Sequence, residues 1–137
     1  MTISKYSNVR LLDVFILGPL QIFISLHVKN KLLKYFLFII GVSNIIYNGH
    51  NYLYLDLNIL KKPLSIFSPF INKNYGKTQL QRLFNIFIMY PIFMHILRTT
   101  NISNYIKLLF LVQIVFGFTY NLKNFIDIWK NKLNHSK

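Results

Sequence analysis

The sequence has no cysteine, so neither a disulfide framework nor a thiolate metal site can form. Glutamate is also absent, and the three acidic residues, Asp13, Asp56 and Asp127, lie far apart along the chain. Paired-carboxylate catalysis and carboxylate metal sites both need acids close together. No P-loop, GxGxxG or Ser-His-Asp pattern is visible either. The sequence therefore predicts a protein without enzymatic activity and without a cofactor.

Charge of either sign is missing from four long stretches of the chain, residues 14–28, 35–55, 83–97 and 108–122. A membrane helix needs roughly 20 mostly apolar residues, and Lys or Arg at its ends can reach out to the interface. A soluble bundle needs polar outer faces, whereas these stretches are apolar on nearly all sides. We therefore expect an all-α integral membrane protein with four spanning helices.

The chain is strongly basic, with 16 Lys and Arg, a net charge of +13 and 53% hydrophobic residues. Basic and aromatic residues together are typical of nucleic-acid binding. Here, however, the charges flank the apolar stretches instead of alternating with exposed aromatic residues. We therefore expect no nucleic-acid partner, and a soluble, basic, helical nucleic-acid-binding protein is the last of three alternatives.

The sequence indicates a tandem repeat of one helical hairpin. Residues 10–19, RLLDVFILGP, align with residues 82–91, RLFNIFIMYP, at an offset of 72, and five of ten positions are identical. Residues 47–53, YNGHNYL, align with residues 120–126, YNLKNFI, at an offset of 73. Two matched blocks in the same order indicate internal duplication. We expect two tandem hairpins, each made of a helix, a short loop and a second helix.

Polar residues recur at matching places in the two predicted hairpins. Folding the first hairpin about residues 30–31 brings Asp13 level with Asn48, and Asn85 comes level with Asn121 in the second. In lipid, polar side chains find partners on neighbouring helices, and each such bond contributes roughly 0.6 to 2 kcal/mol. We therefore predict a structural polar clamp, with headgroup or ion binding as the alternative role. Its residues are Arg10, Asp13, Asn48, Asn51, Arg82, Asn85, Asn121 and Asn124.

Proline and aromatic residues add two further predictions. Pro19 and Pro91 hold equivalent positions inside the first and third helices, where each removes a backbone hydrogen bond and predicts a kink. Tyr47, Tyr120 and Trp129 have amphipathic rings of the kind that gather at the membrane–water interface, so we expect them to act as interfacial anchors.

The chain divides into five predicted segments. These are a short N-terminus of residues 1–9, hairpin one of residues 10–55, a proline-containing basic linker of residues 56–81, hairpin two of residues 82–128, and a basic tail of residues 129–137. Four linker lysines are expected to face anionic lipid, which contributes about 1 kcal/mol for each charge near the surface. They are Lys61, Lys62, Lys73 and Lys77.

The distribution of Lys and Arg predicts the orientation in the membrane. Eleven of these residues lie in or next to the two termini and the linker, counting Arg10, Arg82 and Lys123 at that end of the hairpins, and five lie in or next to the two hairpin loops. The positive-inside rule then places both termini and the linker in the cytoplasm, which agrees with an even number of spans.

Two stretches of the first hairpin, LLDVFILGPLQIFISL and IIYNGHNYL, resemble small, functionally uncharacterised multi-pass membrane proteins of large nucleocytoplasmic DNA viruses. The resemblance implies a viral membrane protein, such as a virion component beneath a capsid. It implies other membrane or capsid proteins as partners, and it implies no catalytic residue.

Together these features predict a non-enzymatic structural or scaffolding component of a viral or host-derived membrane, in contact with anionic lipids. The alternative from a different class is a small transporter or channel built on the internal repeat. Paired broken helices in the two halves of a repeat are typical of some transporters, and Pro19 and Pro91 occupy such paired places.

Overall fold

The computed structural model describes residues 7–72 and 76–135, and it is helical almost throughout. Four helices are long and apolar enough to cross a membrane, namely Ser7–Ser25, Lys31–Asp56, Gln79–Thr99 and Asn104–Lys132. The predicted all-α architecture with four potential membrane helices is confirmed. The chain thus has the make-up of a multi-pass membrane protein.

The first two long helices form hairpin one. Its elements are α1 (Ser7–Leu12), the π-helical η1 (Asp13–Leu17), α2 (Gly18–Ser25), α3 (Lys31–Asn51) and the π-helical η2 (Tyr52–Asp56). The Asn30 side chain caps α3 by accepting a hydrogen bond from the backbone N–H of Leu33. Asn58, with φ of 55°, takes the left-handed conformation just after η2, which asparagine tolerates better than most residues.

The last two long helices form hairpin two. Its elements are α4 (Gln79–Phe84), the π-helical η4 (Asn85–Met89), α5 (Tyr90–Thr99) and α6 (Asn104–His135). A capping box between Thr78 and Gln81 starts α4 three residues before the predicted start of this hairpin. At the other end α6 continues to His135, so much of the predicted tail is helix. The linker contains a short 3₁₀ helix η3 (Ser68–Phe70) and an antiparallel pair, β1 (Ile71–Asn72) and β2 (Gly76–Lys77).

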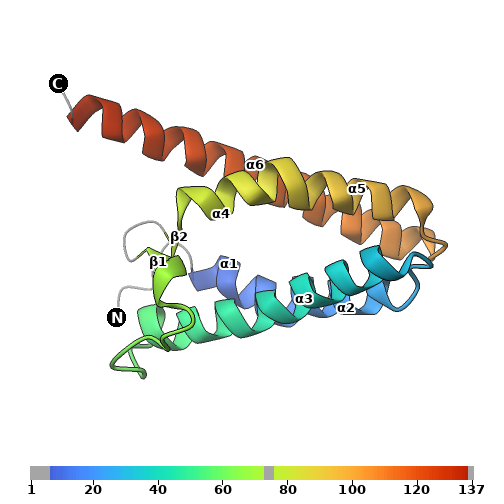
Figure 1. Cartoon of the computed structure of the whole chain (residues 1–137), viewed down its shortest axis with the longest axis horizontal. Helices are drawn as coiled ribbons and strands as arrows, with labels where there is room; N and C mark the ends of the chain where they lie inside the picture. The colour runs from blue at the N-terminus through green and yellow to red at the C-terminus, as the bar shows by residue number, and fades with distance from the viewer. Residues whose placement is uncertain (1–6, 73–75, 136–137) are drawn as a thin grey trace.

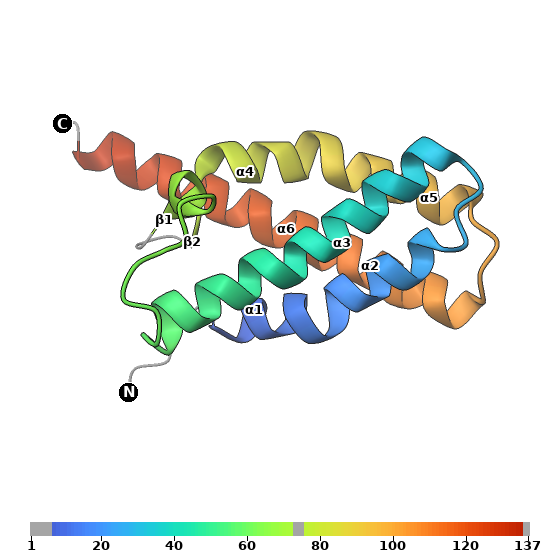
Figure 2. The ribbon, with the colours of Figure 1, turned by 60° about the horizontal axis from the view of Figure 1, so that its bottom comes forward.

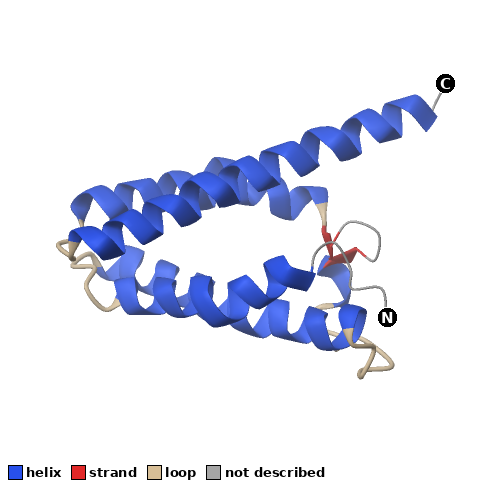
Figure 3. Cartoon of the chain, turned by 180° about the vertical axis from the view of Figure 1, so that it is seen from behind, coloured by secondary structure: helices blue, strands red, loops and turns tan. Residues whose placement is uncertain are grey.

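The two hairpins lie one over the other as two layers (Figure 1). Both hairpin loops lie at one end of the molecule, and the start of α1, the linker and the end of α6 lie at the other (Figures 1 and 2). At a rise of about 1.5 Å per residue, α6 is roughly 48 Å long, whereas the hydrocarbon layer is about 30 Å thick. Its last turns therefore extend past the other helices, as Figure 3 shows.

The hydrophobic core joins the two hairpins toward the loop end. Its buried side chains are Ile24, Val28, Leu37, Met89, Tyr90, Phe93, Ile96, Phe110 and Ile114. Phe93 and Phe110 pack at the centre of this core, with ring centroids 5.3 Å apart, and neither is exposed. Because the shared core lies at this end, the layers are held together there and have fewer apolar contacts toward the linker.

Two glycines allow close packing within hairpin one. A Cβ atom on Gly41 would lie 3.0 Å from the carbonyl oxygen of Gly18, and a Cβ atom on Gly18 would lie 3.0 Å from that of Gly41. Small residues at helix contacts let backbones approach in this way, and they are favoured where lipid provides no hydrophobic driving force. Gly18 and Gly41 therefore set the spacing of α2 and α3.

Both prolines follow a π-helical segment at the same place. The N–H of Gly18 bonds to the carbonyl of Asp13, and the N–H of Tyr90 bonds to the carbonyl of Asn85, so both bonds span five residues. Pro19 and Pro91 come next, and a proline ring crowds the carbonyl four residues before it. A widened turn relieves this crowding, so the expected distortion at the prolines takes the form of a π segment.

The orientation predicts a labelling pattern, which the lack of native cysteine makes simple to read. Ser103→Cys in the α5–α6 loop should stay unlabelled by an impermeant maleimide added to the cytoplasmic side, whereas Lys130→Cys should react. Both positions are exposed. Reaction of Ser103→Cys from the cytoplasmic side would mean that the orientation is reversed.

The glycine contact predicts a difference between two substitutions in α3. Gly41→Ala should lower the free energy of unfolding by about 1 to 3 kcal/mol, because the added methyl group meets backbone atoms of α2. Gly49→Ala is the matched control, since its nearest atom is 3.8 Å away, and the better helix propensity of alanine should stabilise it by up to about 1 kcal/mol. SDS-induced unfolding in mixed micelles measures both, and equal effects would contradict the assigned contact.

Candidate functional site

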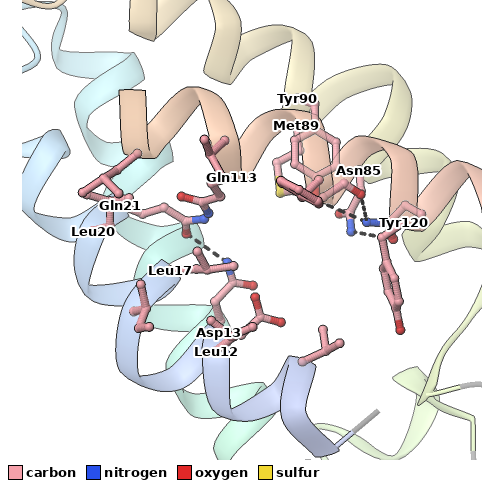
Figure 4. Close-up of a pocket in the computed structure, with 18 of the residues that line it drawn as sticks. Leu12, Asp13, Leu17, Leu20, Gln21, Asn85, Met89, Tyr90, Gln113 and Tyr120 are labelled. Atoms are coloured by element: carbon pink, nitrogen blue, oxygen red, sulfur yellow. Dashed lines mark hydrogen bonds between the residues drawn. The ribbon is translucent and has the colours of Figure 1, made fainter. Parts of the chain in front are cut away.

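A cavity of about 650 Å³ lies between the two hairpins, and we call it the chamber. Its walls come from α1, η1 and α2 of hairpin one, from η4, α5 and α6 of hairpin two, and from Asn44 of α3 and Lys77 of β2. Figure 4 shows Asp13 on one side of this space, with Asn85, Met89 and Tyr90 on the other. The volume is in the range of about 300–1,000 Å³ that is typical of pockets for small ligands.

Asp13 and Lys77 bring opposite charges to the chamber. Asp13 is only 8% exposed, and no other described residue gives its carboxylate a hydrogen bond or an ion pair. The charge of Lys77 acts on Asp13 from beyond ion-pair distance. A buried carboxylate is costly unless a cation or hydrogen-bond donors compensate for its lost hydration. The chamber therefore presents an acid that its own walls compensate only in part.

Neutral polar groups line the chamber as well. Asn85 Nδ2 donates to Asn121 Oδ1 over 3.4 Å, and Asn121 Nδ2 donates to the hydroxyl oxygen of Tyr90 over 3.2 Å. Tyr90 is the acceptor here, so its own proton is free to be donated to a ligand. Gln113 Oε1 is buried and has no hydrogen-bond partner among the described residues. These groups give the chamber donors and acceptors that its walls leave partly unused.

A second cavity of about 660 Å³ lies between α3, α4 and the linker. It shares Asn44, Lys77 and Asn85 with the chamber, so the two cavities meet at these residues. Exposed apolar side chains line both, including Phe15 and Phe116 around the chamber and Leu80 around the second cavity. In a membrane these sides of the molecule would face lipid.

The predicted clamp residues are largely buried, although their pairing differs from the prediction in part. Those that are buried are Arg10, Asp13, Asn48, Asn51, Arg82, Asn121 and Asn124. The predicted pair of Asn85 and Asn121 is present in hairpin two. Asn48 and Asn124 instead donate to carbonyls of their own helices, at Asn44 and Tyr120.

Arg10 corrects the clamp in hairpin one, because it pairs with Asp56 and not with Asp13 or Asn51. Arg10 NH1 lies 2.6 Å from Asp56 Oδ2, and the two side chains are 6% and 3% exposed. Asn51 instead bonds through Oδ1 to the ring of His50. Asp56 was not among the predicted clamp residues, although it supplies the partner of Arg10. The sequence held one signal for this pair. Asp56 directly follows the second charge-free stretch, and a hairpin brings the end of that stretch near Arg10.

The predicted surface residues have mixed outcomes. Trp129 is exposed on the projecting part of α6, as an interfacial anchor requires. Tyr120 lines the chamber, and the hydroxyl of Tyr47 donates to the carbonyl of Phe70 over 2.7 Å, so it fastens the linker to α3.

The linker lysines differ among themselves. Lys61 and Lys62 are exposed, as lipid-facing residues should be. Lys73 lies outside the described residues. Lys77 is half-buried and lines the chamber, so it is less exposed than Lys61 and Lys62, and its contact with lipid stays a prediction.

Sequence reasoning missed the chamber residues Gln21, Asn44 and Gln113. The side-chain amide of Asn44 donates to Gln21 Oε1 over 2.9 Å, which joins α2 and α3. Each of the three is a polar residue inside a charge-free stretch, and this was the available signal. Whether these residues face the chamber depends on how the two hairpins stack, and the hydropathy of the sequence carries no information about that stacking.

Comparison of the chain with protein-family models, curated proteins and solved structures gives no match. Within residues 7–72 and 76–135, no three His, Asp or Glu side chains are grouped closely enough to hold a metal ion. The site is therefore interpreted from its own geometry.

The ion pair predicts a large loss on removal of one partner. Asp56→Asn should lower the free energy of unfolding by roughly 3 to 5 kcal/mol, because the buried Arg10 charge loses its counter-charge. The double substitution Arg10→Leu with Asp56→Leu should recover much of this loss, since no buried charge is left. Asp127→Asn, at an exposed acid of α6, is the control and should change stability by less than about 0.5 kcal/mol. A single variant as stable as this control would contradict a buried pair.

Proposed function

We propose that this chain is a non-enzymatic multi-pass membrane protein that takes an amphipathic molecule from the bilayer into the chamber between its hairpins, as a small carrier or transporter. The observation that supports this most strongly is the chamber itself, which combines apolar walls with an acid and amide groups lacking full partners. Of the functions predicted from the sequence, only carriage of a ligand uses these groups.

The route of access supports a ligand that comes from lipid. Phe15, Ile16 and Phe116 line the chamber and are each more than half exposed. These residues lie well inside the potential membrane spans, so the opening that they surround faces the bilayer and not water. A molecule dissolved in the bilayer can enter sideways, whereas a strongly hydrated solute would first have to lose its water.

The arrangement also supports internal duplication. The π segments η1 and η4 start at Asp13 and Asn85, which are 72 residues apart, the offset that aligns the two hairpins in the sequence. Ligand sites at the interface of two repeats, next to irregular turns in equivalent helices, are typical of transporters built by duplication.

Cytoplasmic termini and a viral membrane remain part of the proposal, supported by the charge distribution and by the sequence resemblance. A purely structural role in such a membrane is the competing proposal, and the many exposed apolar side chains suit it equally well. The two proposals differ in one respect, because a scaffold needs no ligand in the chamber.

Photolabelling tests whether lipid enters the chamber. The protein is reconstituted in vesicles that contain a phospholipid with a diazirine near the end of one acyl chain, and labelled residues are located by mass spectrometry. Met89, which is 7% exposed and lines the chamber, should be labelled. Phe93 lies one turn further in the core and has no exposure, so it should be labelled at least about tenfold less.

A matched pair of substitutions on α6 completes this test. Val112→Trp should reduce the labelling of Met89 several-fold, because Val112 lines the chamber and a larger ring would fill part of it. Leu108→Trp, one turn away at an exposed residue outside the lining set, should not. Labelling of Met89 no stronger than that of Phe93 would reject the carrier proposal in favour of the scaffold.

A further inference from the structure

We propose that the chamber binds the headgroup of a zwitterionic aminophospholipid, with Asp13 receiving its ammonium group and Lys77 its phosphate. This inference rests on the proposed function and names the ligand that the chamber takes.

The charges of the lining favour a ligand that carries both signs. Asp13 and Lys77 are the charged residues among the described lining, and neither has an ion-pair partner in the described chain. An anionic amphiphile can pair with Lys77 but brings no cation to Asp13, and a cationic one can pair with Asp13 but brings no anion to Lys77. Like charges at short range in a medium of low polarity repel strongly. A headgroup with an ammonium and a phosphate places an opposite charge against each residue.

The neutral groups suit the same headgroup. The proton of the Tyr90 hydroxyl and the Nδ2 group of Asn85 are donors for phosphate oxygens, and Lys77 adds a charged donor. A primary ammonium group has three N–H bonds to give, and the carboxylate oxygens of Asp13 accept no hydrogen bond from any described residue. Hydrogen bonds to charged groups are roughly twice as strong as neutral ones. A ligand with a charged phosphate and a charged ammonium group therefore binds these side chains more tightly than a neutral ligand would.

Both charged residues of the lining lie toward the linker end of the molecule. Asp13 lies six residues into its helix, or about 9 Å from its start at Ser7, and Lys77 lies just before α4. Leu17, Leu20 and Met89 line the chamber deeper in the membrane, and Met89 is ten residues into its span. The two charges are therefore near the headgroups of the leaflet on the linker side, and the deeper lining is largely apolar with the amides of Gln21 and Gln113 in it.

Competition between headgroups tests this assignment. Vesicles of phosphatidylcholine contain one photoreactive lipid at a time, always with the same diazirine acyl chain, on phosphatidylethanolamine, on anionic phosphatidylglycerol or on a cationic trimethylammonium lipid. We expect phosphatidylethanolamine to label Met89 about tenfold more strongly than either of the singly charged lipids, as is typical for one added charged hydrogen bond.

Two variants identify which residue recognises which charge. Asp13→Asn should reduce the preference for phosphatidylethanolamine over phosphatidylglycerol about tenfold, and Lys77→Gln should reduce its preference over the cationic lipid by a similar factor. Asp13→Asn should keep the fold, since Asn85 occupies the equivalent place in hairpin two, and SDS unfolding checks this. The controls Asp127→Asn and Lys123→Gln, both at exposed positions of α6, should leave the preferences unchanged.

Each outcome either supports or rejects the assignment. Equal labelling of Met89 by all three lipids would overturn the headgroup assignment while leaving the proposed function intact. A preference for either singly charged lipid would also overturn it and would indicate a site for one charge only. Failure of every lipid to label Met89 above Phe93 would reject the proposed function itself.

Discussion

Hydrocarbon offers a polar side chain no hydrogen bond, and this constraint determines how the four helices are arranged. Most polar residues of the spans are buried between helices, where they can find partners. Arg10 meets Asp56, Asn44 meets Gln21, and Asn121 meets both Asn85 and Tyr90. Many large apolar side chains are exposed along the spans, whereas a soluble bundle has polar outer faces. Polar contacts therefore join the helices within each hairpin, alongside the apolar core.

The same constraint explains why the hairpins can be closed at one end and hollow at the other. Toward the loops, Phe93, Phe110 and their neighbours fill the space between the layers. Toward the linker the facing residues are polar and carry charge, so they need partners of particular geometry and cannot simply fill space. The linker spans this end and is fastened to α3 by Tyr47 and by His50, which accepts from the N–H of Leu64. The chamber lies between the packed core and this fastened linker.

The sequence predicted the elements well and their mutual contacts only in part. Charge-free stretches identify the four helices because the membrane imposes their length and polarity. The capping box at Thr78 was readable in principle, and it moves the start of hairpin two to Gln79. The partner of Arg10 could not be fixed from spacing, because the π segment η2 extends the second helix to Asp56 and a long guanidinium side chain can reach along it. Likewise, Lys77 looked like a surface lysine, and only the stacking of the layers turns it toward the chamber.

One aligned position that differs between the two hairpins gives the chamber its negative charge. Asp13 and Asn85 occupy equivalent places at the start of η1 and η4, and both line the chamber. Asn85 has a partner on α6, whereas the Asp13 carboxylate has none among the described residues. An asparagine at position 13 could form a hydrogen bond between helices at a lower free-energy cost, since burying an amide is less costly than burying a carboxylate. A carboxylate at that position is therefore a burden for stability alone, and it becomes useful when a cation enters the chamber. Under the proposed duplication, hairpin two keeps the structural form of this polar position, and hairpin one carries the form that recognises a ligand.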